Sequence, residues 1–430
     1  MDPVRLMVIG AGNRGTVYAR FALDEPSRAK VVAIVDPNLS RLRIRSKEHD
    51  LCENSKALYK EVPAKDNEIW SQIDAVVVAT PDKTHCNIVL QLLELGQKYI
   101  LVEKPMATSE EDCRAMKMAA DEKGAVVSVC HVLRYTPLNL EVKRLISSGE
   151  LGIILSIQHT EPVGYYHFAH SFVRGNWRRT DESSFSLLTK SCHDIDLITF
   201  WMEDEVGGVV RSVSSFGSRR LFRKENKPSA AGAATRCVEC AFESQCPYSA
   251  KSIYVDAAQR GVKGWPVSVL VDREVTKESV EFAVKHGPYG LCVYECDNDV
   301  CDNQIVNLQF QNGSTASFNM IATTEQICTR QTKIYGSKAE MTVDASRDEI
   351  RIYDFLTKTE RIINPKANVP GTSSLRGHGF ADYHLMDSFM RSVAQDDPSI
   401  ISSDAKESLK THIIVFKAEQ SRLSNSSLSW

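Results

Sequence analysis

A glycine-rich turn near the start of the chain carries the clearest chemical pattern in the sequence. Gly10, Gly12 and Gly15 have the spacing G-x-G-x-x-G, between an apolar run typical of a strand and a segment with helical spacing. In that setting the glycines allow a tight turn, a close approach of the backbone to a pyrophosphate, and packing of the helix on the strand. Free N–H groups at the helix start attract phosphates. The pattern predicts a dinucleotide-binding turn, which also includes Asn13 and Arg14.

Asp36 stands at the end of the next apolar run, residues 31–35. An acidic residue at this place accepts hydrogen bonds from the adenosine ribose, which favours NAD over NADP. Arg41 follows shortly afterwards, and a nearby arginine accommodates the additional phosphate of NADP. We therefore expect NAD as the cofactor and leave NADP open.

Two later apolar runs end in residues that could also face the cofactor, because ligands of doubly wound sheets lie beyond the carboxyl ends of the strands. Thr80, Pro81 and His85 follow the first of these runs, and Glu103 and Lys104 follow the second. A lysine at such an end is placed for proton transfer over the cofactor. An ordinary solvated lysine is the alternative.

Four motifs together resemble the Gfo/Idh/MocA family of oxidoreductases. They are the glycine turn, Thr80-Pro81 with His85, Glu103-Lys104-Pro105, and His193-Asp194-Ile195-Asp196. Residues 174–178 and a cysteine-rich segment are similar to a subgroup of that family. The resemblance implies a Rossmann domain followed by an α/β domain with a large open, mainly antiparallel sheet. It also implies nicotinamide chemistry on sugars or cyclitols, with Lys104 as a catalytic residue.

His193 lies near a predicted helix start, and the resemblance makes it the acid–base candidate that faces the nicotinamide. Hydride transfer from a secondary alcohol requires removal of the hydroxyl proton, which a histidine or lysine with a pKa near neutral does well. Many sugar dehydrogenases of the family carry an aspartate four residues before this histidine. Here that position is Thr189, so the aspartate is absent.

Lys190 is the third catalytic candidate, because it follows the position where the aspartate is missing. Two ammonium groups close together disfavour double protonation. Lys190 beside Lys104 would therefore leave one pKa below the usual value of about 10.4 and supply a proton acceptor. Alternatively, Lys190 binds an anionic group of the substrate, or it is an exposed lysine at the helix entry.

By analogy with the family, the region before residue 178 lines the substrate pocket. Trp177 offers a flat face to a sugar ring, and Arg174 or Asn176 offers hydrogen-bond partners to hydroxyls. A buried core tryptophan is the alternative. The predicted substrate residues are His131, Arg134, Arg174, Asn176, Trp177 and Asp196.

Half of the 12 cysteines lie between residues 237 and 301, and three of them have the knuckle-like spacing C-x-x-C-x5-C. Three thiolates need a fourth ligand to close a tetrahedral zinc site. The predicted zinc ligands are Cys237, Cys240, Cys246 and Cys296, with Cys292 as an equal choice for the fourth ligand and Cys301 as a weaker one. Ordinary reduced cysteines and an iron–sulfur cluster are the alternatives.

The composition narrows the class of protein. The chain has 430 residues, of which 43% are hydrophobic and 25% charged, values of a globular protein. Lys+Arg 52 against Asp+Glu 55 gives a net charge of −3, which recommends neither nucleic acid nor an anionic membrane as a partner. The apolar runs are too short for a membrane span, and the N-terminus lacks a signal-peptide pattern. We expect a cytoplasmic protein with a small-molecule substrate.

Strands and helices alternate in the first part of the chain, and continuous apolar strands imply a parallel sheet covered on both faces. We expect a Rossmann dinucleotide-binding domain at 1–130 and a substrate and oligomerisation domain at 131–430, with a cysteine-rich insert at about 217–302. Alternating runs around Gln311-Asn312-Gly313-Ser314 predict a β-hairpin in the second domain. The open sheet suggests a homodimer or homotetramer.

The predicted function is an NAD(P)-dependent oxidoreductase that moves a hydride between nicotinamide and a sugar, sugar derivative or cyclitol. Two alternatives stay open. One is a redox-neutral lyase, epimerase or glycosidase that uses NAD transiently, and the other is a dinucleotide-sensing regulator on the same fold. Retention of Lys104 and His193 argues against the regulator.

Overall fold

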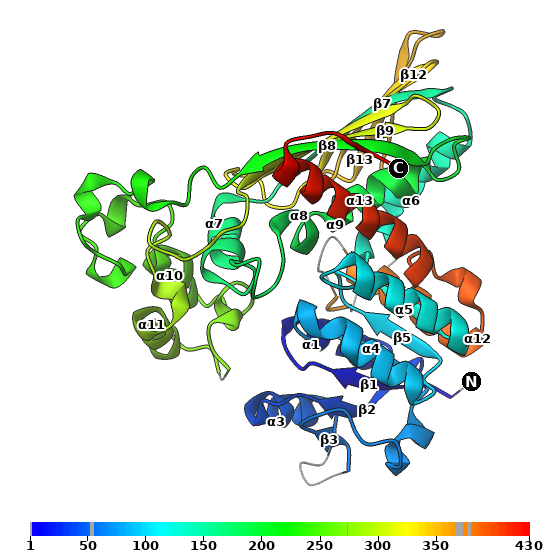
Figure 1. Cartoon of the computed structure of the whole chain (residues 1–430). Coiled ribbons are helices and arrows are strands. Elements are labelled where there is room, and N and C mark those ends of the chain that lie inside the picture. The colour runs from blue at the N-terminus through cyan, green and yellow to red at the C-terminus, as the bar shows by residue number, and fades with distance from the viewer. Residues whose placement is uncertain (1, 52–55, 273, 366–372, 376–379) are drawn as a thin grey trace.

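The computed structural model describes residues 2–51, 56–272, 274–365, 373–375 and 380–430, which form two sheets and an insert (Figure 1). The first sheet is parallel, in the order β3-β2-β1-β4-β5-β6. Its strands are β1 (Val4–Ile9), β2 (Ala29–Val35), β3 (Leu58–Tyr59), β4 (Ala75–Val78), β5 (Tyr99–Val102) and β6 (Val126–Val129). The strand order reverses between β1 and β4, which is where doubly wound sheets bind ligands. The Rossmann prediction is confirmed.

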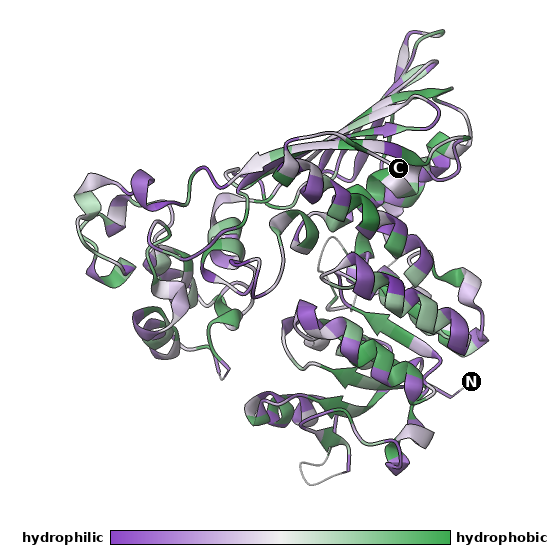
Figure 2. Ribbon diagram, viewed as in Figure 1, coloured by the Kyte–Doolittle hydropathy of each residue, from purple (hydrophilic) through white to green (hydrophobic). Residues whose placement is uncertain are grey.

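Both faces of the first sheet are buried, as its apolar strands predict. Along β1, Leu6 and Val8 pack into one hydrophobic cluster, whereas Met7 and Ile9 pack into another. The helices that follow the strands are α1 (Asn13–Ala19), α2 (Phe21–Asp24), α3 (Leu39–Glu48), α4 (His85–Glu94) and α5 (Glu110–Lys123). Figure 2 shows hydrophobic strands between helices that carry hydrophilic residues on their outer sides. This packing holds the carboxyl ends of the strands at one fixed edge.

The second sheet has nine strands in the order β14-β13-β12-β11-β7-β10-β9-β8-β15. Its pairings are antiparallel except for β7 with β10, which is parallel. The strands are β7 (Ile154–Pro162), β8 (Val210–Ser218), β9 (Asn303–Phe310), β10 (Thr315–Ile321), β11 (Gln331–Gly336), β12 (Ala339–Asp344), β13 (Glu349–Asp354), β14 (Thr359–Ile363) and β15 (Leu428–Ser429). The predicted hairpin is the β9–β10 pair, and the predicted mainly antiparallel sheet is confirmed.

The helices of the second domain outside the insert pack partly on the second sheet and partly against the first domain. They are α6 (Pro137–Ser147), α7 (Tyr165–Phe168), α8 (Ser186–Thr189), α9 (Cys192–Met202), α12 (Ala381–Gln395) and α13 (Ala405–Ser424). α13 contacts β8 and α9 on one side and α5 and β6 on the other, so the end of the chain packs against both sheets (Figure 1). Among the described residues, no helix is both long and apolar enough to cross a membrane.

The residues between β8 and β9 form the insert, which contains the short helices α10 (Asp256–Gln259) and α11 (Lys277–His286). It has a small hydrophobic cluster of its own, built around Tyr254, Val267, Val280 and Val284. In Figure 1 the insert extends from one end of the second sheet and lies beside the first domain, on the side of α3.

Candidate active site

The glycine turn between β1 and α1 has the close packing that its spacing predicts. Gly10 has φ +95°, and a Cβ there would lie 2.3 Å from the carbonyl oxygen of Ala79. A Cβ on Gly15 would lie 1.8 Å from the carbonyl oxygen of Gly10. By contrast, the nearest atom to a Cβ on Gly12 is Nη1 of Arg41, at 3.7 Å. The turn therefore fits a dinucleotide, because Gly10 and Gly15 set its shape while Gly12 keeps a side free for a pyrophosphate.

Asp36 holds the glycine turn against the start of α3. Its Oδ2 accepts the N–H of Ala11 at 2.7 Å and its Oδ1 accepts the N–H of Asn38 at 2.8 Å. The residue is buried. Each carboxylate oxygen has a second lone pair, so the contact with a ribose stays a prediction. Asn13, at the first position of α1, is exposed at this edge.

Glu103 connects the glycine turn to the catalytic candidate Lys104. Its Oε1 accepts Arg14 Nε and the Tyr18 hydroxyl, both at 2.6 Å, and its Oε2 accepts the Lys104 N–H at 2.8 Å. Arg14 also donates to Asp382 at 2.6 Å. Burial alone would raise the pKa of Glu103, but the charges of Arg14 and Lys104 outweigh it and hold that pKa below its usual value. The side chains of Arg14 and Glu103 thus bind protein groups, and a direct cofactor contact by either stays untested.

The residues after β4 tie neighbouring strand ends together. The His85 ring lies 2.8 Å from the carbonyl oxygen of Pro105 through Nδ1 and 3.0 Å from that of Thr80 through Nε2. His85 is fully buried, so the structure shows it as a link between the ends of β4 and β5 rather than as an exposed cofactor contact. Thr80 and Pro81 lie at the carboxyl end of β4, as predicted.

The same edge is linked to the second domain by Asp82, which the sequence analysis did not single out. Its Oδ2 accepts the Trp177 indole N–H at 2.9 Å and the Ser183 hydroxyl at 2.6 Å. Asp82 directly follows the Thr80-Pro81 motif, and this position at a strand end could have indicated from the sequence that it belongs to the site. The link brings Trp177 to the cofactor edge of the first sheet.

Lys104 lies at this junction. Its Nζ donates to the carbonyl oxygen of Thr189 at 2.6 Å and lies 5.8 Å from the centre of the Trp177 ring. Thr189 occupies the position of the missing family aspartate. Lys104 therefore contacts a backbone carbonyl oxygen at this position and not a carboxylate. His193 is in the first turn of α9, as predicted, and its ring centre lies 5.9 Å from that of His131. The structure therefore places Lys104, Trp177 and the start of α9 around one edge.

Lys190 does not have the environment that was expected for a proton acceptor. It is buried, with its Nζ 3.0 Å from Glu161 Oε1 and 2.9 Å from Cys328 Sγ. Burial alone would lower the pKa of Lys190, but Cys328 and Glu161 outweigh it and raise that pKa above its ordinary value. The expectation of a lowered lysine pKa is wrong for Lys190, because a buried carboxylate partners its ammonium. The expectation of an exposed lysine is wrong as well.

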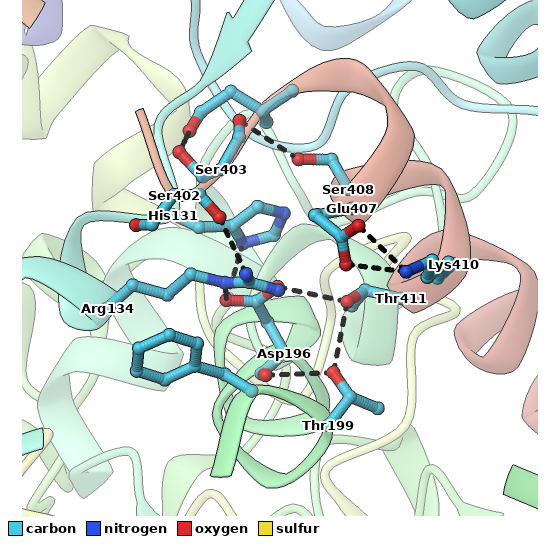
Figure 3. A network of polar contacts seen from close by, with 12 residues as sticks. His131, Arg134, Asp196, Thr199, Ser402, Ser403, Glu407, Ser408, Lys410 and Thr411 are labelled. Atoms are coloured by element: carbon cyan, nitrogen blue, oxygen red, sulfur yellow. Dashed lines mark hydrogen bonds and ion pairs between the residues drawn. The ribbon is translucent and has the colours of Figure 1, made fainter. Parts of the chain in front are cut away.

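Three predicted substrate residues instead form a buried network, shown in Figure 3. Arg134 donates to both carboxylate oxygens of Asp196 at 2.7 Å, and Thr411 donates to Asp196 at 2.9 Å. His131 Nδ1 lies 3.7 Å from Asp196. His131, Arg134 and Asp196 are 0–2% exposed, so the structure does not support direct substrate contacts for them. The network holds η3 (Val132–Tyr135), α9 and α13 together.

Arg174 also lies away from the cofactor edge. It is 1% exposed and donates to the carbonyl oxygens of Leu291 at 2.7 Å and Tyr248 at 2.8 Å. Its role is to fasten the insert, and a substrate contact is not supported. Asn176 is exposed and Trp177 is half-buried, so these two stay substrate candidates.

A second buried network of charged residues includes Asp194, which directly follows His193. The sequence motifs did not predict this network. Arg330 Nε lies 2.8 Å from Asp194 and 3.1 Å from Glu161, and the His159 ring lies 3.1 Å from Asp194. Burial alone would raise the pKa of Asp194, but the positive charge of Arg330 and the contact with His159 hold it well below its usual value. Asp194 belongs to the quoted His-Asp-x-Asp motif, whereas nothing in the local pattern around Glu161 or Arg330 points to the pairing.

The predicted zinc site is not supported by the arrangement of the cysteines. Among the described residues, no group of three or more His, Cys, Asp and Glu side chains is arranged to hold a metal ion. Cys237, Cys240, Cys246 and Cys292 do line one cavity of about 20 Å³, but Arg174 lines it too and donates to Cys237 Sγ at 3.4 Å. A guanidinium beside a thiol disfavours a second cation there. The thiol of Cys296, the chosen fourth ligand, instead donates to the carbonyl oxygen of Cys292.

Comparisons with known proteins agree with this fold. The chain is 28% identical over 216 residues to the scyllo-inositol 2-dehydrogenase (NAD(+)) of Bacillus subtilis, which covers 50% of this chain and 57% of the relative. It is 26% identical over 217 residues to the 2,7-anhydro-N-acetylneuraminate hydratase of Mediterraneibacter gnavus, covering 50% and 53%. The chain thus spans little more than half the length of these relatives.

Among solved structures, that of levoglucosan dehydrogenase with NADH has a TM-score of 0.69 at 17% identity, over 100% of this chain and 99% of the other. This likeness shows a shared fold. Residues 4–131 match the NAD-binding Rossmann fold of one oxidoreductase family, and residues 143–422 match its C-terminal alpha/beta domain. The subgroup with a cysteine-rich insert stays a prediction. The two domain models of the family together match most of this chain, so the chain belongs to the Gfo/Idh/MocA oxidoreductase family.

Proposed function

We propose that the protein is an NAD(P)-dependent oxidoreductase that acts on a hydroxyl or carbonyl group of a sugar, sugar derivative or cyclitol. The observation that carries the proposal is the position of Lys104. Glu103 ties it to the helix of the glycine turn, and its ammonium points to the start of the segment that bears His193. The inositol dehydrogenase among the relatives supports the class of substrate.

In this proposal, a bound nicotinamide supplies the hydride acceptor or donor. Lys104 has three donor positions on its ammonium, of which one binds the Thr189 carbonyl, so two can be directed at a substrate oxygen. His193 would take up or return the hydroxyl proton. Trp177, held by Asp82, would offer its ring to the sugar, with Asn176 beside it.

A redox-neutral reaction is the second candidate, because one of the relatives is a hydratase by name. Such an enzyme would use the same cofactor and the same proton-transfer residues, but it would return the hydride within each turnover. Reduced nicotinamide would then not accumulate during the reaction. Direct product analysis separates the two candidates.

We also propose that the protein is a homodimer or homotetramer. The support is the second sheet, in which β8, β9 and β10 turn Ser214, Asn307 and Ser317 away from the core into a shallow hollow. A second copy of the chain is the proposed cover, since a sheet face of this size can be buried by a symmetric partner. Light scattering on the native protein should give two or four times 48.0 kDa, and a mass of one chain would contradict the proposal.

The proposal of a cytoplasmic location rests on the sequence alone.

The proposed function is tested by screening aldoses, cyclitols and uronates for reduction of NAD and NADP, followed by the variant Lys104→Met on the best substrate. Loss of the donor that Lys104 directs at the substrate oxygen should lower turnover by about 10²-fold to 10³-fold. The dissociation constant of NAD, measured by calorimetry, should stay close to that of the wild type, because Lys104 is proposed to act on the substrate.

Lys60→Met is the matched control, since Lys60 is an exposed lysine of the same domain. It should change neither turnover nor affinity. Near-normal turnover in Lys104→Met would remove Lys104 from the catalytic residues. Failure of the wild-type protein to bind any nicotinamide dinucleotide would reject the proposed function as a whole.

A further inference from the structure

The insert reaches the first domain at the side of the glycine turn. Asp272 lies between α10 and α11 in the sequence. Its Oδ1 accepts Arg41 Nε at 2.9 Å and Nη2 at 2.8 Å, and its Oδ2 accepts the Asn38 side-chain amide at 3.1 Å. One carboxylate from the insert thus binds two residues at the start of α3.

The position of Asp272 is held from both sides in the sequence. Leu270 and Val275 pack against the hydrophobic cluster of the insert. Asp272, which contacts Arg41 and Asn38, thus lies between two residues that pack on this cluster.

Arg41 is the cation that the cofactor would meet. Its Nη1 lies 3.7 Å from the place where a Cβ on Gly12 would stand, and Asn38, which accepts the Arg41 N–H, follows Asp36 closely. In this fold the residue at the end of β2 meets the adenosine ribose, and a nearby arginine accommodates the 2′-phosphate of NADP. Arg41 stands at that place, but its guanidinium already binds a carboxylate.

We propose that Asp272 is a specificity-determining residue, which makes the protein prefer NAD to NADP by occupying Arg41. The inference rests on the proposed function, because it requires a dinucleotide at the glycine turn. A 2′-phosphate would have to displace Asp272 from Arg41, and it would then lie near the carboxylates of both Asp36 and Asp272. The ribose hydroxyls of NAD meet no such repulsion. The insert thus contributes to the adenosine end of the cofactor site.

The test is calorimetric binding of NAD and of NADP to the purified full-length protein, so it does not depend on a known substrate. Asp272→Asn removes the charge with almost no change in size. It should tighten NADP binding relative to NAD by about fivefold, the size that an exposed charge pair supports. In an Arg41→Ala background, the same substitution should lose most of this effect. High salt should reduce it, because both side chains are partly exposed.

Glu281→Gln is the matched control, because it removes the same charge from an exposed position of the insert on α11. It should leave the ratio of the two affinities unchanged. An unchanged ratio in Asp272→Asn, or an equal change in Glu281→Gln, overturns the inference while NAD binding keeps the proposed function intact. If the wild-type protein binds neither dinucleotide, the inference and the proposed function fail together.

Discussion

For Lys190, the neighbouring residues in the sequence predict its location but not the side chains that contact it. Its position before His193 correctly predicted that it lies close to the candidate site, but not that Glu161 would meet it from β7. Glu161 is fully buried and lies within 3.1 Å of both Lys190 and Arg330. A buried ammonium with such a partner keeps its proton, which favours a structural role for Lys190 over that of a proton acceptor.

Replacing Lys190 should therefore change stability before it changes proton transfer. Lys190→Met leaves Glu161 buried with one cation fewer, which should lower the free energy of unfolding by about 3 kcal/mol. Lys190→Arg should restore part of the loss. Urea denaturation of both variants measures the effect.

Lys263→Met provides the comparison, because it makes the same chemical change at an exposed position of the insert. Its free energy of unfolding should stay within about 0.5 kcal/mol of the wild type. A Lys190→Met protein with wild-type stability and a shifted pH–rate profile would return Lys190 to the catalytic residues.

At the scale of elements, the strands and the hairpin could be predicted from the sequence. The hydrogen bonds and ion pairs that join different elements could not. Apolar runs identified the parallel strands other than β3, and the Asn312-Gly313 pair identified the β9–β10 hairpin. Those signals are local, because hydrophobic periodicity and turn chemistry act over a few residues. The order of the nine strands depends on pairings between distant segments, and no local pattern states it.

The buried network of Figure 3 explains why several predicted site residues turned out to be structural. Arg134 and Asp196 belong to different elements, and Thr411 approaches Asp196 from α13, near the end of the chain. Charged residues near a motif suggest a substrate contact when only the sequence is known. Burial shows instead that the pair fixes α9, the helix that carries His193, to η3 and α13. The position of His193, the proposed acid–base residue, thus depends on side chains that are buried in this network.

At the scale of the whole molecule, the second domain contacts the first on more than one side of the cofactor edge. Asp82 binds Trp177 and Ser183, and Asp272 binds Arg41. On α13, His412 accepts the Met106 N–H at 2.9 Å through Nε2, and its Nδ1 lies 2.7 Å from the carbonyl oxygen of Ser408. The docking of the end of the chain onto the first domain therefore requires a neutral histidine at this position, with its proton on Nδ1.

This requirement predicts that the molecule loses stability in mild acid. Burial lowers the pKa of His412 to about 3, and burial also lowers that of neighbouring His131 to about 4. In the unfolded chain both have a pKa of about 6.5, so below that pH the unfolded state binds more protons than the folded one. The stabilisation is complete above pH 6.5 and is lost as the pH falls toward the two folded-state values. At pH 5 the loss should be about 2 kcal/mol for each histidine.

The variant His412→Gln tests this pH dependence, because glutamine keeps a donor and an acceptor but does not titrate. Between pH 7 and pH 5, its free energy of unfolding should fall by about 2 kcal/mol less than that of the wild type. His286→Gln removes a histidine that is exposed on α11, and it should follow the wild-type curve. Equal losses in all three proteins would contradict the assignment, because the acid sensitivity would then come from groups other than the histidine that joins α13 to the first domain.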